Sequence, residues 1–210
     1  MGYFPIVLDL RDRPVLVIGG GSVAQRKVQG LLAAGARVTI VSPVLTPDLA
    51  VLAADRRLHH EPRCYQPGDL AGFSLVFVAT SDPALSEEVA REGRTRGVWI
   101  NAADDPAHCD FILPAVLRRG PLTVSVSSDA TSPALAGMVR DELADLLGDE
   151  YSALAELVAE VRGELRAARR SPDGATWRRA LDAELRALVA EQRYADARQR
   201  LRHRLGVADA

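Results

Sequence analysis

The chain has 210 residues, of which 48% are hydrophobic and 26% are charged, and its formal net charge is −2. This composition is typical of a globular protein with room for more than one compact unit and gives no indication of nucleic-acid binding. No apolar run approaches the roughly 20 residues of a membrane span, and the first residues lack the pattern of a signal peptide, so we expect a cytoplasmic protein whose cysteines, Cys64 and Cys109, are reduced.

The first expected strand, 15–19, runs into three consecutive glycines and then into a helical segment, 23–34. The spacing G-x-G-x-x-A, from Gly19 through Gly21 to Ala24, is the pattern by which a Rossmann-type strand–loop–helix unit binds a pyrophosphate. Gly19 permits the tight turn, Gly21 lets backbone N–H groups approach the phosphates, and Ala24 lets the helix pack close to the strand. The order of strand, loop and helix therefore favours a dinucleotide site over a simple tight turn.

Strand and helix signals keep alternating over the first 113 or so residues, which predicts an α/β fold with a parallel sheet. The further strands are expected at 37–42, 58–61, 74–79 and 98–101. The further helices are expected at 47–54 and from Asp82-Pro83, an N-cap followed by proline, to Gly97.

The second expected strand ends in Val41-Ser42-Pro43, without the acid that usually binds the ribose hydroxyls of NAD. Ser42 could supply one ribose hydrogen bond, and no basic pair follows to hold a 2′-phosphate. The sequence therefore favours NAD over NADP. The alternative, that this is no nucleotide site, stays open.

Polar residues also follow two later strands, at Thr80-Ser81-Asp82 and from Asn101 to Asp105. Ligands of open parallel sheets bind at the carboxyl ends of the strands, where both segments would lie. Asp104 and Asp105 are the candidates for proton transfer, although a pair of aspartates that caps a turn is the alternative. His108-Cys109-Asp110 follows, but three consecutive residues seldom converge on one ion, and we predict no metal site.

After Asp110 the pattern changes to two strands, 111–117 and 122–127, around a turn at Arg118-Arg119-Gly120-Pro121. A helix is expected from Ser132-Pro133 to about residue 147. Helices then follow from residue 151 to a break at 171–174 and in a last region, 177–205.

The polar loop from Ser127 to Ser132 would place a helix N-terminus beside a strand end, a geometry that suits a carboxylate or a phosphate. Arg118 and Arg119 could add charge-assisted hydrogen bonds to an acidic ligand. A capped helix with exposed arginines is the alternative.

Together these segments resemble the precorrin-2 dehydrogenase/sirohydrochlorin ferrochelatase family, which forms the N-terminal module of siroheme synthase. The matches run in unbroken order over roughly residues 3–147. They are carried by Phe4-Pro5-Ile6, Leu10-Arg11-Asp12-Arg13, 17–27, 32–36, 38–43, Ala79-Thr80-Ser81-Asp82, Asn101-Ala102-Ala103-Asp104, 111–115, 124–128 and 131–136.

The resemblance implies NAD-dependent oxidation of precorrin-2 to sirohydrochlorin by a homodimer, and in some members insertion of Fe²⁺ into the product. It implies that Asp104 is the catalytic aspartate. The cofactor contacts expected from motif and resemblance together are Gly19, Gly21, Ser22, Val23, Ser42, Pro43, Val44, Thr80 and Asn101. The tetrapyrrole substrate is expected at Arg118, Arg119, Ser128 and Ser132.

The expected organisation is a Rossmann-type NAD domain at 1–113, a small α+β dimerisation and substrate segment at 114–147, and a C-terminal helical domain at 148–210. A fused siroheme synthase would continue into a methyltransferase, so methylation is not expected of these residues. Ala130 stands where the family usually has glycine, which puts the substrate contacts of its loop in question. Asp105, beside Asp104, could share the catalytic role. An NAD-binding, redox-sensing dimer without catalysis is the alternative function.

Overall fold

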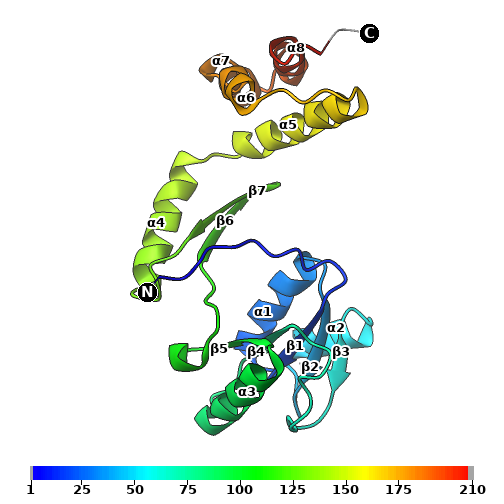
Figure 1. Ribbon diagram of the computed structural model, residues 1–210, viewed down its shortest axis with the longest axis vertical. Helices are drawn as coiled ribbons and strands as arrows, with labels where there is room; N and C mark the ends of the chain where they lie inside the picture. The colour runs from blue at the N-terminus through cyan, green and yellow to red at the C-terminus, as the bar shows by residue number, and fades with distance from the viewer. Residues whose placement is uncertain (1, 208–210) are drawn as a thin grey trace. The chain divides into compact units, whose positions relative to one another are not determined.

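The computed structural model describes residues 2–207 and divides the chain into two compact units, Met1–Leu113 and Pro114–Ala210 (Figure 1). Each unit is described by itself below. The finer division at residue 147 remains a prediction. No helix among residues 2–207 is long and apolar enough to cross a membrane.

The first unit contains a five-stranded, fully parallel sheet of order β3-β2-β1-β4-β5. Its strands are β1 (Pro14–Ile18), β2 (Arg37–Val41), β3 (His59–Glu61), β4 (Leu75–Val78) and β5 (Trp99–Ala102). Its helices are α1 (Ser22–Ala33), α2 (Pro47–Ala54) and α3 (Pro83–Arg96), with a 3₁₀ turn, η1, at Pro106–His108. The strand order reverses between β1 and β4, which is the switch point where doubly wound sheets bind their ligands. The predicted α/β fold and its elements are confirmed.

Alternation along the buried strands divides the interior of this unit into two layers, one on each face of the sheet (Figure 1). Val15 and Val17 of β1 pack with Val28 of α1 on one face. Leu16 and Val89, from β1 and α3, pack on the other face. Because both faces are covered, the central strands are apolar at nearly every position, which is why the sequence shows them as unbroken apolar runs.

The second unit combines a two-stranded antiparallel sheet with five helices. Its elements are β6 (Ala115–Arg119), β7 (Leu122–Val126), α4 (Pro133–Leu146), α5 (Glu150–Ala167), α6 (Gly174–Ala180), α7 (Ala183–Ala190) and α8 (Tyr194–Arg204). Residues of α5 to α8 share one buried apolar cluster, with Val161, Leu185 and Leu201 at its centre.

The structure corrects the predicted start of the first hairpin strand, because residues 111–114 do not pair with β7. Asp110 and Phe111 lie instead along the free edge of β5, where an Asp110 carboxylate oxygen accepts the Ile100 N–H at 2.8 Å. Arg118 and Arg119 are strand residues of β6, and only Gly120-Pro121 forms the turn.

The region 177–205 is three helices rather than one helical run. Asp182 ends the first of them by capping the next, since its side chain accepts the N–H of Leu185. An N-cap of this kind needs extended backbone, which interrupts a continuous helix.

Candidate functional site

The loop between β1 and α1 has the close backbone packing that its glycines predicted. A Cβ at Gly19, whose φ is +111°, would overlap the carbonyl of Ala79, and a Cβ at Gly20 would overlap the carbonyl oxygen of Val44. A Cβ at Gly21 would meet no atom within 4 Å. Gly21 is therefore open on the side from which a ligand would approach, while the other two glycines are needed for the loop to fit between β2 and β4.

Helix α1 begins without the side-chain cap that the next three helices have. Its N-cap is Gly21, no side chain accepts its first N–H groups, and its first turn contains no acid. Thr46, Asp82 and Ser132 cap α2, α3 and α4. The free N–H groups and the positive end of the α1 dipole fit the pyrophosphate of a dinucleotide.

At the end of β2, the side chain of Ser42 is already hydrogen-bonded within the protein. It is 7% exposed, and its hydroxyl donates to the Val44 carbonyl oxygen at 2.8 Å. A ring nitrogen of His60 lies 2.9 Å from the Ser42 carbonyl oxygen. Pro43 and Val44 are exposed, so these two residues offer the accessible surface at this strand end.

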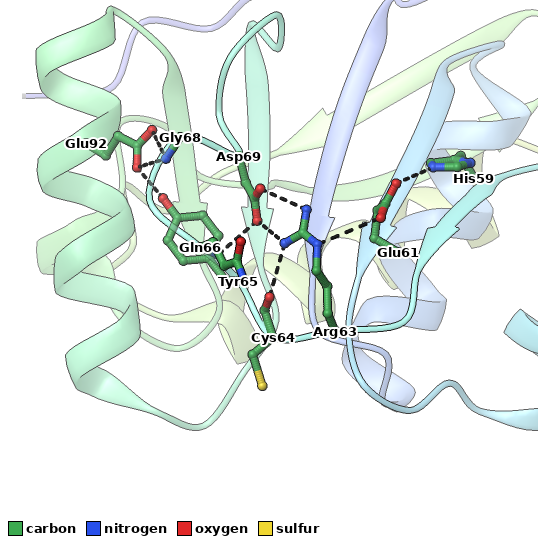
Figure 2. Close-up of polar contacts among 9 residues, drawn as sticks. All are labelled: His59, Glu61, Arg63, Cys64, Tyr65, Gln66, Gly68, Asp69 and Glu92. Carbon is green, nitrogen blue, oxygen red and sulfur yellow. Dashed lines mark hydrogen bonds and ion pairs between the residues drawn. The ribbon is translucent and has the colours of Figure 1, made fainter.

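The nearby segment after β3 contains an arginine that is already paired (Figure 2). The Arg63 guanidinium donates to both carboxylate oxygens of Asp69, at 2.7 and 2.9 Å, and its Nε lies 3.8 Å from Glu61. Hydrogen bonding to Arg63 lowers the pKa of Asp69. A guanidinium held in this two-pronged pair is not free to bind a 2′-phosphate.

The same segment is fixed to α3 by a second contact (Figure 2). The Tyr65 hydroxyl donates to Glu92, whose carboxylate also accepts the Gly68 N–H. Burial, together with Glu92, raises the pKa of Tyr65. This contact holds in place the segment that carries Asp69.

Thr80 and Asp82, at the end of β4, have local roles in the structure. The Thr80 hydroxyl accepts the Asp82 N–H at 3.2 Å, and the Asp82 carboxylate caps α3. Asn101 of β5 is 6% exposed, and its side chain points inward rather than to the strand end. Its amide oxygen accepts from Lys27 of α1 at 2.9 Å, and its amide nitrogen donates to the Phe111 carbonyl at 3.0 Å.

Asp104 and Asp105 follow β5 in very different environments. Asp104 is exposed, has a left-handed backbone with φ of +58°, and its carboxylate forms no hydrogen bond with any residue of 2–207. The Asp105 carboxylate lies 2.6 Å from Nδ1 of His108. Asp104 is therefore the aspartate whose oxygens are available to a substrate.

Cys109 closes the turn that carries both aspartates. Its sulfur accepts the Ala102 N–H at 3.2 Å and lies 3.1 Å from the Ala102 carbonyl oxygen, to which the thiol donates. Burial raises the pKa of this thiol. Within the described part of the chain, no group of three or more His, Cys, Asp or Glu residues could hold a metal ion.

The four predicted substrate residues lie in the second unit. The Ser128 hydroxyl donates to the Ser132 carbonyl oxygen at 2.8 Å and accepts the Ser132 N–H, while the Ser132 hydroxyl caps α4. Arg119 donates to the carbonyl oxygens of Leu147 and Ala144 at the end of α4, and Arg118 is exposed. Three of the four side chains thus shape their own unit, and Arg118 is left accessible.

The loop from Ser128 to Ser132 contains Ala130, the alanine that stands where the resemblance predicted a glycine. Asp129 and Ala130 both have positive φ, of +51° and +60°. Ala130 therefore adopts a conformation that glycine takes more easily, and the two Ser128 bonds hold the loop in it.

A cavity of about 550 Å³ lies away from these residues, at the amino ends of β2 and β3. The glycine loop and Asp104 follow the carboxyl ends of β1 and β5, so the cavity is separate from the candidate site. It is lined by residues 36–39, 53 and 56–60.

Comparison with family models assigns the first unit to a protein family. Residues 6–115 match the family NAD_binding_7, described as "Putative NAD(P)-binding". The chain belongs to this NAD(P)-binding family. A nicotinamide dinucleotide site therefore agrees with the open glycine loop and the uncapped start of α1.

Curated relatives of this NAD(P)-binding chain include two siroheme synthases. That of Methylobacillus flagellatus is 44% identical over 77% of this chain and 35% of the relative. Siroheme synthase 1 of Serratia proteamaculans is 39% identical over 96% of this chain and 43% of the relative. The predicted resemblance is confirmed, and the chain spans less than half the length of these relatives.

Among solved structures, the fold is similar to that of "SirC, precorrin-2 dehydrogenase", with a TM-score of 0.75 and 24% sequence identity. The similarity covers 94% of this chain and 99% of that one. At this identity the likeness establishes the fold.

Proposed function

We propose that the chain is an NAD-dependent dehydrogenase that oxidises precorrin-2 to sirohydrochlorin in siroheme synthesis. The observation that carries the proposal is Asp104, an exposed carboxylate that forms no hydrogen bond with any of residues 2–207 and that follows β5 at the carboxyl edge of a Rossmann-type sheet. The siroheme synthase relatives and the precorrin-2 dehydrogenase neighbour support the substrate and the reaction.

Different residues around the glycine loop would bind different parts of the cofactor. The N–H groups at the start of α1, from Ser22 and Val23, would bind the pyrophosphate, and Pro43 and Val44 would line the adenosine side. NAD, when bound, accepts the hydride that leaves the tetrapyrrole. The paired state of Arg63 supports NAD rather than NADP, because no free cation among the described residues of this segment would neutralise a 2′-phosphate.

Asp104 would take the proton that accompanies the hydride. One C–H bond of precorrin-2 would lose its hydrogen with the electron pair, as the hydride that NAD accepts. A second C–H or N–H bond of the macrocycle would lose its proton to the Asp104 carboxylate, and the electron pair left behind would complete the new double bond. The proton would then pass from Asp104 to water. Exposure leaves this carboxylate in contact with solvent, so that it can release the proton after each turnover.

Insertion of Fe²⁺ into sirohydrochlorin is a second proposal for the same carboxylate, with the ion as substrate. Asp104 would accept the pyrrole protons that the metal replaces. The observation that favours it is the same exposed carboxylate, which has no hydrogen-bond partner among residues 2–207.

We also propose that the protein is a homodimer. Helix α4 leaves Leu135, Met138 and Leu146 between 48% and 73% exposed. Among residues 2–207, the β6–β7 sheet that packs against α4 has two strands, each with one edge unpaired. A second copy of the chain would cover this surface.

The deciding experiment measures NADH formation by absorbance from precorrin-2 with NAD, and with NADP for comparison. Asp104→Asn keeps the left-handed backbone, which asparagine tolerates, and should lower kcat by roughly 10²- to 10⁴-fold, the range of general base catalysis. Asp105→Asn is the matched control and should keep most of the activity, since Asp105 is bonded to His108.

Two outcomes would contradict this assignment. Full turnover by Asp104→Asn would remove Asp104 as the base. A folded wild-type protein that binds NAD but does not oxidise precorrin-2 would favour the redox-sensing dimer instead.

A further inference from the structure

Lys27, on the second turn of α1, is the only lysine of the chain, and its side chain is half-buried. Its ammonium lies 5.2 Å from the centre of the Phe77 ring and donates to Asn101 at 2.9 Å. Burial lowers the pKa of Lys27, while Cys109 and Asp104 act in the opposite direction and Arg26 adds to the lowering. The lysine thus joins α1 to the strands and to the turn that follows them.

Asn101 also contacts the segment that follows the turn. Its amide nitrogen donates to Phe111, whose ring packs edge-on against Phe77 with the centroids 5.5 Å apart. The segment from Asp105 to Asp110 is tied back to β5 through Cys109 and Asp110. Both ends of the turn that carries Asp104 are therefore fixed. Asn101, which precedes the turn, is held by Lys27, and Phe111, which follows it, is held by Asn101.

We propose that Lys27 is a positioning residue for the dehydrogenation, holding Asp104 in place through Asn101 and Phe111. This inference rests on the proposed function and adds to it Lys27, for which neither the glycine motif nor the resemblance implied a role. An ammonium suits this position because it is a compact point charge, which can face an aromatic ring and donate to a single amide oxygen at once.

The kinetic test is a double-mutant cycle. Lys27→Met keeps the apolar stem and removes the donor, and we expect it to lower kcat roughly 10- to 100-fold, as a misplaced catalytic group does, with little change in the Kd for NAD. In the Asp104→Asn background the same substitution should cost almost nothing, because the group that Lys27 positions is already absent. Circular dichroism and NAD binding check that each variant is folded.

A second readout does not depend on turnover. Reductive methylation with ¹³C-formaldehyde labels Lys27 and the N-terminal amine, and the Lys27 signal is the one missing in Lys27→Met. Its titration should move to lower pH in Asp104→Asn, since a carboxylate that favours the ammonium is lost, and should not move in Glu87→Gln on α3.

The results separate the two ideas. Lack of turnover by the NAD-bound wild type overturns the proposed function, whatever the NMR shows. Equal losses from Lys27→Met in both backgrounds, or a Lys27 titration unchanged by Asp104→Asn, overturn the role of Lys27 even when the wild type is active.

Discussion

Gly20 and Gly21 are neighbours in the chain, but a methyl group would have opposite effects at the two positions. At Gly20 it would overlap backbone of the segment after β2, and at Gly21 it would enter open space. Gly20 is therefore required by the fold, whereas we propose that Gly21 is required by the phosphates that would approach the start of α1.

We expect Gly21→Ala to change the free energy of unfolding by no more than about 1 kcal/mol, the difference between the two residues at an N-cap. The Kd for NAD should rise at least tenfold, because the new methyl group blocks the phosphates. Gly20→Ala should lose about 1–3 kcal/mol of stability through overpacking. Denaturant unfolding and NAD titration measure both quantities, and tight NAD binding by Gly21→Ala would place the pyrophosphate elsewhere.

The glycine loop could be predicted because all of its information lies within six consecutive positions. The environment of Asp104 could not, because Lys27 and Asn101 are 74 residues apart in the sequence. Their contact depends on how α1 packs against β1 and β4, and a single lysine in a sequence carries no sign of its partner. Asn101 was expected among the cofactor contacts because its position at the end of a strand can be inferred from the sequence. The direction of its side chain cannot be inferred in this way, and in the structure the side chain contacts Lys27 and Phe111.

Among the elements, the helices from α6 to α8 show what a single carboxylate can do. Asp182 caps α7 and also pairs with Arg200 at 2.6 Å, and hydrogen bonding to Arg200 lowers its pKa. In the same helical cluster, hydrogen bonding to Arg198 lowers the pKa of Glu164.

Because these pKa values are lower in the folded state, the stability they contribute is present above the unfolded value of about 4 and is lost as the pH falls through the folded value. Asp182→Asn keeps the cap and removes the charge, while Asp182→Ala removes both. We expect the alanine variant to be about 1 kcal/mol less stable than the asparagine variant at neutral pH. Both should lose less stability than wild type on acidification, as followed by urea unfolding at several pH values. Equal stability of the two variants would show that the cap contributes nothing.

The prediction of one long region at 177–205 followed from its helical pattern, in which no proline or glycine marks a break. Aspartate is also common on exposed helix faces, so the residue type alone did not identify Asp182 as a cap. In the first unit, the predicted bounds of the strands and helices lie closer to the observed ones, because the ends of apolar runs, prolines and glycines mark them in the sequence.

At the scale of the whole molecule, the proposed homodimer has a direct test. Sedimentation should give twice the chain mass of 22.6 kDa. Met138→Glu and Leu135→Glu, at exposed apolar positions of α4, should shift the protein toward monomer, because a buried unpaired charge is costly. Glu142→Gln on the same helix is the control that should not. A monomeric wild type at micromolar concentration would contradict the proposal.

The edges of the two sheets differ in a way that bears on aggregation. The free edge of β5 is covered by the segment with Asp110, and β3 at the other edge is three residues long, so the parallel sheet presents little template for another chain. Among residues 2–207, β6 and β7 pair only with each other, and each leaves one edge unpaired. Fibril-like growth by strand addition would therefore start at this hairpin, and a partner that occupies its edges would also protect the chain from misassembly.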